Sequence, residues 1–417
     1  MPEMSTDQGA APATRPRDDD SPMEFDPYSD AFFDDPYDTY RWMRDEAPVY
    51  YSDRWDFHAL TRNADVVAAH RDWETFSSAY GVTLDALSMH QRFDELNMLI
   101  LLDPPEHERL RKLVRQVFTK AAIANLEPLV TDVVTSHVEA LAGRTEFDLV
   151  ADFAALFPVE IISSMLGVPP GERQQIRLWT DGFLHREPNN PFATESGVAA
   201  SMAMNDYFLQ LAQEKRRRPD DLIISRLVTT TYEDETGVTH RLTDEDIGTF
   251  AVLLAAAGSE TVTKLMGNGV MAFHHNPDQW ELVLADPGVI PGAIEEMLRL
   301  NPPSQYQGRF TTRDVELEGG TIPAGSPTLL VTGAATRDPR AYDRPDAFDI
   351  KRGGATTLAF GYGAHSCLGS WLARLEARVA LQALREHWPR FDVDTDGLQR
   401  VTMSNVAGYS HIPVRVR

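Results

Sequence analysis

The spacing of apolar residues divides this chain into a long helical part and two short β regions. Across residues 37–300, apolar residues recur at helical spacing, and short segments rich in Pro and Gly interrupt them. Residues 49–60 alternate between apolar and polar, which predicts a small hairpin. Residues 307–332 predict a second β region, because glycines and a proline separate short apolar groups there. A helix is expected over residues 368–387, followed by short strands, so the pattern is typical of a mainly α protein with a small β region.

Breaks in this pattern mark turns and the start of the fold. Residues 168–171 (Val-Pro-Pro-Gly) end one helix and lead into another, and residues 184–194 contain two prolines and two asparagines, which predicts a loop. Residues 1–24 are polar and rich in Pro, Ala and Asp, without the apolar core of a signal peptide. We therefore expect a disordered tail over residues 1–24 and one folded domain over residues 25–417, without internal repeats or a flexible linker.

One predicted helix is long for a globular protein and has an unusual centre. Thr243, followed three residues later by Asp246, predicts a capping box, and the helix it opens is expected to run past Phe273. Residues 257–261 (Ala-Gly-Ser-Glu-Thr) lie in its middle, where glycine weakens a helix. The hydroxyl of Thr261 can bond the carbonyl four residues back and bend the helix, which would make room for a diatomic ligand and water.

Composition and charge narrow the class of protein. The 417 residues are 42% hydrophobic and 24% charged, as in ordinary globular proteins. The longest apolar run, residues 250–258, is far shorter than the ~18 residues of a membrane-spanning helix. The net charge of −24 argues against nucleic acid or an anionic membrane as a partner. With one cysteine and no signal segment, we expect a cytoplasmic, bacterial protein.

The single cysteine, Cys367, lies in the decapeptide Phe-Gly-Tyr-Gly-Ala-His-Ser-Cys-Leu-Gly, residues 360–369. A lone cysteine cannot form an internal disulfide or supply the four thiolates of an iron–sulfur cluster, but one thiolate can hold one haem iron. The glycines allow tight turns and close approach of the backbone, and N–H groups of such a loop can stabilise a thiolate. Two other readings are a small buried hydrophobe and a nucleophile with His365 as its base.

These residues carry a resemblance to the cytochrome P450 family. The decapeptide resembles the haem loop Phe-Gly-x-Gly-x-His-x-Cys-x-Gly at every fixed position, and further motifs follow the family's order across nearly the whole chain from Phe25 onward. The resemblance implies a single-domain, mainly α fold with haem b between the long central helix and the cysteine loop. It further implies that Cys367 ligates the iron and that Phe360 belongs to the haem-binding loop.

The resemblance assigns roles to three other groups of residues. Residues 257–261 resemble the family's oxygen-activation motif, which implies that Glu260 delivers protons and that Thr261 organises hydrogen bonds around the oxygen; many bacterial members have Asp where this chain has Glu260. A structural Glu-x-x-Arg pair completed by a downstream arginine matches Glu296, Arg299 and Arg352. The positions that bind the haem propionates in bacterial relatives match His107, Arg111, Arg309 and His365.

The function implied is that of a haem-thiolate monooxygenase, in which the thiolate favours O–O cleavage. It would activate O2 with two electrons and hydroxylate or epoxidise a mainly apolar small molecule. Because no flavin domain is fused to the chain, we expect a ferredoxin with a ferredoxin reductase as electron donor, and a monomer. Alternatives are a peroxide-driven peroxygenase and a non-catalytic haem protein that binds a ligand. The pair Glu260 and Thr261 disfavours both, because peroxygenases on this fold generally lack such a pair and a haem protein that only binds a ligand needs no proton relay.

Two surfaces are assigned from position alone. Steroids, terpenoids, fatty acids, polyketides and aromatic compounds all remain open as substrates. The expected walls of the substrate pocket are residues 81–99, residues 184–194 and the side chains Phe250, Leu254, Ala257 and Gln305. The neighbouring Gln307 can instead serve the propionates. A basic patch for the donor is expected from Arg109, Lys112 and Arg115, extended by Arg374 and Arg378.

Overall fold

The computed structural model describes residues 23–233, 238–353 and 357–417. Residues 1–22 of the predicted tail therefore lie outside the described residues. Phe25, close to the expected start of the domain, is buried and makes edge-to-face contacts with Phe32, Tyr40, Tyr50 and Phe57.

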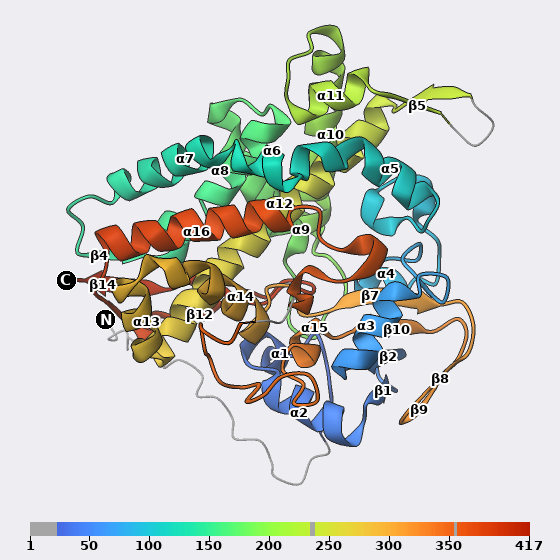
Figure 1. Ribbon diagram of the computed structural model, residues 1–417. Helices are drawn as coiled ribbons and strands as arrows, with labels where there is room; N and C mark the ends of the chain where they lie inside the picture. The colour runs from blue at the N-terminus through green and yellow to red at the C-terminus, as the bar shows by residue number, and fades with distance from the viewer. Residues whose placement is uncertain (1–22, 234–237, 354–356) are drawn as a thin grey trace, which may run out of the picture.

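The described residues form a body of helices with small sheets at its edge, as the apolar pattern predicted (Figure 1). The α-helices are α1 Asp30–Asp34, α2 Tyr37–Glu46, α3 Asn63–Arg71, α4 Leu84–Leu87, α5 Glu106–Val114, α6 Lys120–Ala124, α7 Glu127–Ala140, α8 Phe157–Leu166, α9 Arg173–Leu184, α10 Glu195–Arg217, α11 Ile223–Thr229, α12 Asp244–His275, α13 Pro277–Ala285, α14 Ile290–Leu300, α15 Thr332–Ala335 and α16 Ser370–His387. The strands are β1 Val49–Ser52, β2 Phe57–Leu60, β3 Phe76–Ser77, β4 Glu146–Asp148, β5 Thr231–Glu233, β6 Thr239–Arg241, β7 Gln307–Thr311, β8 Val315–Leu317, β9 Gly320–Ile322, β10 Pro327–Leu330, β11 Phe391–Val393, β12 Gln399–Arg400, β13 Tyr409–His411 and β14 Pro413–Val416.

Helix α12 is the centre of the helical body. The predicted capping box is present: the Thr243 hydroxyl accepts from the Asp246 N–H at 3.0 Å, and the Asp246 carboxylate accepts from the Thr243 N–H at 2.9 Å. Along its 32 residues α12 packs against α8, α9, α10 and α16, and most of its side chains are buried. A helix that is apolar on nearly all sides belongs in a core, which explains why α12 runs through the middle of the molecule (Figure 1).

The largest sheet joins the two β regions expected from the sequence. Its strand order is β1-β2-β10-β7-β3, with β10 parallel to β2 and the other pairs antiparallel. The hairpin predicted over residues 49–60 is β1 and β2. The strand β7 carries Arg309 and pairs with β3, so this sheet sets the position of that arginine.

Several short elements among the described residues differ from the helical prediction for residues 37–300, including the two-residue strand β3. The strand β4 pairs with β14 at the far end of the sequence, β5 and β6 form a hairpin that projects from the body, and residues Val150–Ala154 form a π-helical turn (Figure 1). A strand of three residues is too short to change the local period of apolar residues, and the partner of β4 lies more than 260 residues away. Among the described helices, none is long and apolar enough to cross a bilayer.

Candidate functional site

The middle of α12 packs closely against α8 at Gly258 and has an exposed residue, Ala257, next to it. A Cβ placed on Gly258 would lie 2.9 Å from Cγ1 of Ile162, so glycine lets α8 approach α12 closely. The Thr261 hydroxyl donates to the carbonyl of Ala257 at 2.8 Å, which is the bond that the sequence predicted. The side chain of Ala257 is exposed although the residues around it on this central helix are mostly buried. This turn of α12 can therefore face a ligand inside the molecule.

The cysteine loop is shaped by glycines and by one backbone bond. The N–H of Cys367 donates to the carbonyl of Phe360 at 2.8 Å. Gly361 and Gly363 have φ of +64° and +69°, and a Cβ on Gly363 would collide with the backbone of His70. Only glycine therefore lets this loop pack against α3 in this conformation.

The Cys367 sulfur is accessible and at the same time closely surrounded by protein. The side chain is exposed, yet burial raises the pKa of its thiol, as expected for a group that faces an interior space. The N–H of Gly369 and the charges of Arg111 and Arg374 act in the opposite direction and lower the pKa of that thiol. The same dipoles and charges would stabilise a thiolate bound to a metal.

Basic side chains from three segments, α5, β7 and the loop itself, gather around Cys367. The rings of His107 and His365 lie 4.1 Å apart, and Arg111 Nη2 donates to the carbonyl of Ser366 at 2.6 Å. Arg309 is 4% exposed and donates to the carbonyl of Gly308 at 2.6 Å. The structure thus brings together all four residues expected to bind propionates.

Among the described residues, negative charge balances this buried basic cluster only in part, through Asp103 beside Arg309. Burial, reinforced by Arg111 and Arg309, lowers the pKa of His107 to about 4, and burial lowers the pKa of Arg309 to about 10 although Asp103 opposes this. Burial and the same neighbouring charges hold the pKa of His365 well below its usual range. Neither ring nitrogen of His107 has a hydrogen-bond partner among the described residues. A ligand with two carboxylates would supply both the charge and the acceptors, so these residues fit a haem.

One member of the cluster, His70 at the end of α3, was not found from the sequence. Burial, with a smaller effect of Arg309, lowers the pKa of His70 to about 3, and its ring also acts on His365. A histidine in an ordinary helix belongs to no motif, so nothing short of the fold could place it beside the cysteine loop.

Glu260 and Thr261 are adjacent in sequence but point to different neighbours. Glu260 is 2% exposed, and Lys264 Nζ lies 2.9 Å from its Oε2 on the same face of α12. No hydrogen bond between the Glu260 and Thr261 side chains is found in the described part of the chain. The lysine was not anticipated, although its spacing of four residues from Glu260 is the spacing of a helical ion pair.

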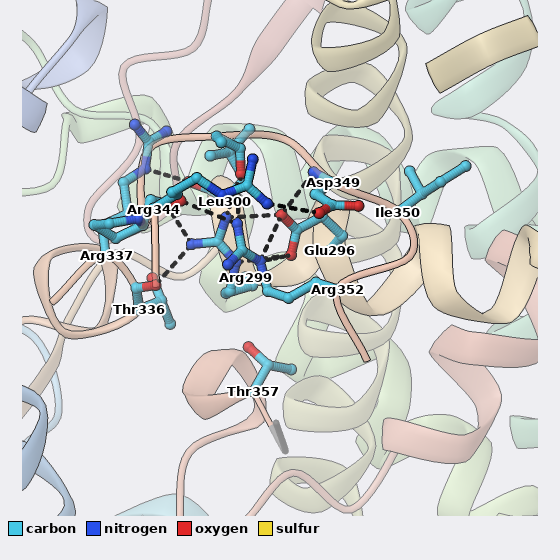
Figure 2. A network of polar contacts seen from close by, with 12 residues as sticks. Glu296, Arg299, Leu300, Thr336, Arg337, Arg344, Asp349, Ile350, Arg352 and Thr357 are labelled. Carbon is cyan, nitrogen blue, oxygen red and sulfur yellow. Dashed lines mark hydrogen bonds and ion pairs between the residues drawn. The ribbon is translucent and has the colours of Figure 1, made fainter. Parts of the chain in front are cut away.

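The predicted pair on α14 forms a buried network with a third residue from a distant segment (Figure 2). Arg299 donates to both Glu296 oxygens at 2.7 and 2.8 Å, and Arg352 Nε lies 3.1 Å from each of them. The side chains of Glu296 and Arg299 are each 3% exposed, and that of Arg352 is 13% exposed. Arg299 also donates to the carbonyls of residues 336, 345 and 347, so the network ties α14 to the segment that leads toward the cysteine loop.

The predicted pocket wall needs two corrections. Gln305 is fully enclosed, its Oε1 accepts from the Tyr40 hydroxyl, and its Nε2 donates to the Pro302 carbonyl, so its amide has no free end for a substrate. Phe250 is 1% exposed within the main core and lines no open space. Leu254 is 9% exposed, and Ala257 is the open position on this face.

The predicted basic patch is smaller than expected. Lys112 and Arg115 are exposed, whereas the guanidinium of Arg109 lies 5.4 Å from the ring of Tyr232. Arg374 and Arg378 do not extend the patch freely, because carboxylates of Glu295 and Glu127 neutralise them.

An exposed aromatic residue lies beside this surface. Trp371 is 42% exposed at the start of α16, with Lys120 Nζ 5.1 Å and the Arg374 guanidinium 5.6 Å from its ring. Arg374 also lies over Phe360 at 4.5 Å, so this surface reaches the cysteine loop.

Known proteins resemble this chain over nearly its full length. Residues 289–406 match the family model described as Cytochrome P450. A protein of Mycobacterium tuberculosis named "Putative cytochrome P450 123" is 40% identical over 399 residues, which cover 95% of this chain and 98% of that protein. The "Vitamin D(3) 25-hydroxylase" of Pseudonocardia autotrophica is 37% identical over 94% of this chain and 96% of its own.

Solved structures give the same picture. The structure of CYP109E1 from Bacillus megaterium in complex with testosterone matches with a TM-score of 0.84 at 30% identity, over 92% of this chain and 98% of that chain. A mutant of P450 EryK in complex with erythromycin B matches with a TM-score of 0.82 at 36% identity, over 91% and 95% of the two chains.

Proposed function

This chain belongs to the cytochrome P450 family, and from that membership we propose that it is a monooxygenase that draws electrons from a ferredoxin and oxidises a mainly apolar small molecule. The family consists of haem-thiolate enzymes that use O2 and redox partners. The observation that carries the proposal is the accessible, enclosed sulfur of Cys367 beside a buried basic cluster.

The residues around Cys367 would hold the haem in one orientation. The Cys367 thiolate would bind the iron, while His107, Arg111, Arg309 and His365 would hold the two propionates. Bound in this way, haem supplies the binding and reductive cleavage of O2 that no amino-acid side chain can perform. The glycines of the cysteine loop and the small side chain of Ala257 on α12 would leave room for a haem between these two segments.

We further propose that Thr261 and Glu260 manage the protons of the reaction. The Thr261 hydroxyl donates to the Ala257 carbonyl, so its oxygen remains available as an acceptor next to the exposed Ala257. It can therefore accept and fix the hydrogen bond of a water there. Glu260, on the adjacent position, would replace protons consumed during the cleavage of O2.

The substrate we propose is apolar and of considerable size. Relatives named for hydroxylation of vitamin D3 and of erythromycin support this class. In this chain, the open position on α12 is the small, apolar Ala257, next to Leu254. Such a wall contacts hydrocarbon and offers no charge to a polar substrate.

The donor we propose is an acidic ferredoxin with its reductase. Lys112, Arg115 and Lys120 are exposed cations in a chain of net charge −24, and Trp371 supplies an aromatic contact among them. Charge complementarity of this kind mainly accelerates association, and exposed Trp residues often carry much of the binding energy. We propose that the enzyme works as a monomer in the cytoplasm, where a single thiol stays reduced.

A screen of apolar compounds tests the proposal. A substrate should displace iron-bound water and change the haem absorption spectrum, and turnover with ferredoxin, reductase and isotopically labelled O2 should place one labelled oxygen in the product. Product formed only with added peroxide would support a peroxygenase instead.

A further inference from the structure

A chain of hydrogen bonds runs from the start of α5 to the ring of His365. The carboxylate of Asp103, just before α5, accepts from the hydroxyl of Ser77 through Oδ2 and from the N–H of Ser78 through Oδ1, the latter at 2.8 Å. The hydroxyl oxygen of Ser78 lies 3.3 Å from Nε2 of His365. A single serine therefore connects Asp103 to the histidine of the cysteine loop.

The two serines are held in place by the structure around them. Ser77 is the last residue of β3 and pairs with Phe310 of β7, so both serines lie beside the strand that carries Arg309. The exposed fraction is 3% for Ser77 and 0% for Ser78. The Ser77 hydroxyl also accepts from the N–H of Ala79 at 3.1 Å. The hydroxyl of Ser78 is thus fixed at a buried position next to His365.

The ring of His365 has one engaged nitrogen and one open nitrogen. Nε2 faces the Ser78 hydroxyl, whereas Nδ1 has no hydrogen-bond partner among the described residues. The ring lies 4.1 Å from that of His107, so the open nitrogen belongs to the basic cluster. A hydrogen bond at one nitrogen of an imidazole fixes the ring and determines which nitrogen is left for a ligand.

We propose that Ser78, held by Asp103, is a positioning residue that fixes the His365 ring so that Nδ1 is the atom that binds a haem propionate. The proposal rests on the proposed role of His365 at a propionate. It adds the atom that makes this contact and the two residues that select it. Neither Ser78 nor Asp103 was assigned a role from the sequence.

The chemistry of the imidazole ring determines the direction of each hydrogen bond. A neutral imidazole has one N–H donor and one acceptor nitrogen, and a propionate carboxylate only accepts hydrogen bonds. Nδ1 must therefore carry the proton, and the Ser78 hydroxyl donates to Nε2. In the other tautomer, the lone pair of Nδ1 would face the carboxylate and repel it. Asp103 acts through the oxygen that accepts from the Ser78 N–H, so an asparagine at this position can replace it.

Resonance Raman spectra of the haem-loaded ferric enzyme test the contact without turnover, because the bending bands of the propionates shift with the hydrogen bonds that they accept. Ser78→Ala and Asp103→Ala should shift a propionate band in the same direction as His365→Leu. Asp103→Asn, which keeps an oxygen for the Ser78 N–H, should retain the wild-type band. The matched control Ser163→Ala removes a buried hydroxyl without a partner among the described residues and should change nothing. Wild-type bands in Ser78→Ala would overturn the proposal.

The midpoint potential of the haem gives a second readout that a merely structural role of Ser78 would not move in a defined direction. Without the Nδ1 hydrogen bond, the negative charge of the propionate is less compensated, which favours the ferric state. At a fixed solution potential, Ser78→Ala should lower the ratio of ferrous to ferric enzyme about threefold. For a one-electron couple this is a fall of ~28 mV. An unchanged or higher potential in Ser78→Ala would contradict the proposal, and Ser163→Ala should match the wild type.

A double variant separates action through His365 from a direct contact between Ser78 and the propionate. If Ser78 acts through His365, the bands of the double variant Ser78→Ala, His365→Leu should equal those of His365→Leu alone. An additional shift in the double variant would show that Ser78 binds the propionate itself and would overturn the proposal. Unchanged bands in His365→Leu would refute the proposed role of His365 at the propionate. A shift in His365→Leu with none in Ser78→Ala would refute only the positioning by Ser78.

Discussion

Removal of the Glu296 carboxylate should destabilise the protein by several kcal/mol. Glu296 accepts from Arg299 through two N–H groups, from Arg352 Nε and from the N–H of Asp349. The variant Glu296→Ala leaves two guanidiniums without their counter-charge, one of them 3% exposed. Breaking a buried charged network in this way costs about 3–5 kcal/mol. For a chain of this size the entropy of unfolding is ~0.8 kcal/mol per kelvin, so the melting temperature should fall by about 4–6 °C.

The adjacent residue provides a matched control. Glu295 pairs with Arg374 at 2.5 Å, but its side chain is 36% exposed, and exposed pairs contribute about 0–1 kcal/mol. Calorimetry of the haem-loaded proteins should therefore show a fall of ~1 °C or less for Glu295→Ala. The reasoning is refuted if Glu296→Ala melts within ~1 °C of the wild type, or if both variants lose the same stability.

Three further predictions concern protons and electrons. Thr261→Ala should leave haem content and substrate binding nearly intact while electrons are diverted to peroxide. The measurement is the amount of peroxide released per reductant consumed. An unchanged ratio of product to reductant would exclude Thr261 from proton delivery. Lys112→Glu or Arg115→Glu should slow reduction by ferredoxin several-fold and weaken its salt dependence, without effect on peroxide-supported turnover; equal loss in both assays would indicate a folding defect. On α9, burial and the neighbouring charge of Glu260 raise the pKa of Asp181 from 3.8 to about 7. Between these values the folded state binds more protons than the unfolded state, so the contribution of Asp181 to stability falls as the pH rises through this window. The melting temperature of the wild type, measured relative to Asp181→Asn, should therefore decrease from pH 4 to pH 7, and a constant difference would contradict the raised pKa.

Motifs with a fixed spacing allowed much of the site to be predicted from the sequence. The capping box of α12, the Thr261 bond to the Ala257 carbonyl and the Glu296–Arg299 pair all depend on residues a few positions apart, so the helical period alone brings them together. The basic cluster was found differently, since His107, Arg309 and His365 lie far apart and only the order of motifs connected them.

Residues whose role depends on packing between distant elements could not be found in this way. His70 reaches the cysteine loop only because Gly363 permits contact with α3. Gln305 was misassigned for the same reason. Alternation along a strand predicts which side chains lie on the same face. It does not predict that Tyr40 covers the face that carries Gln305.

The ligation of haem iron by Cys367 is the central claim, and the spectrum of the reduced, carbon-monoxide-bound protein tests it most directly. A thiolate opposite carbon monoxide gives the red-shifted Soret band for which the family is named. We predict this band for the wild type and its complete loss in Cys367→Ser, with the folded state preserved because the loop is shaped by glycines and by the backbone bond to Phe360. A wild type without the shifted band, or a Cys367→Ser variant that keeps it, would contradict the account.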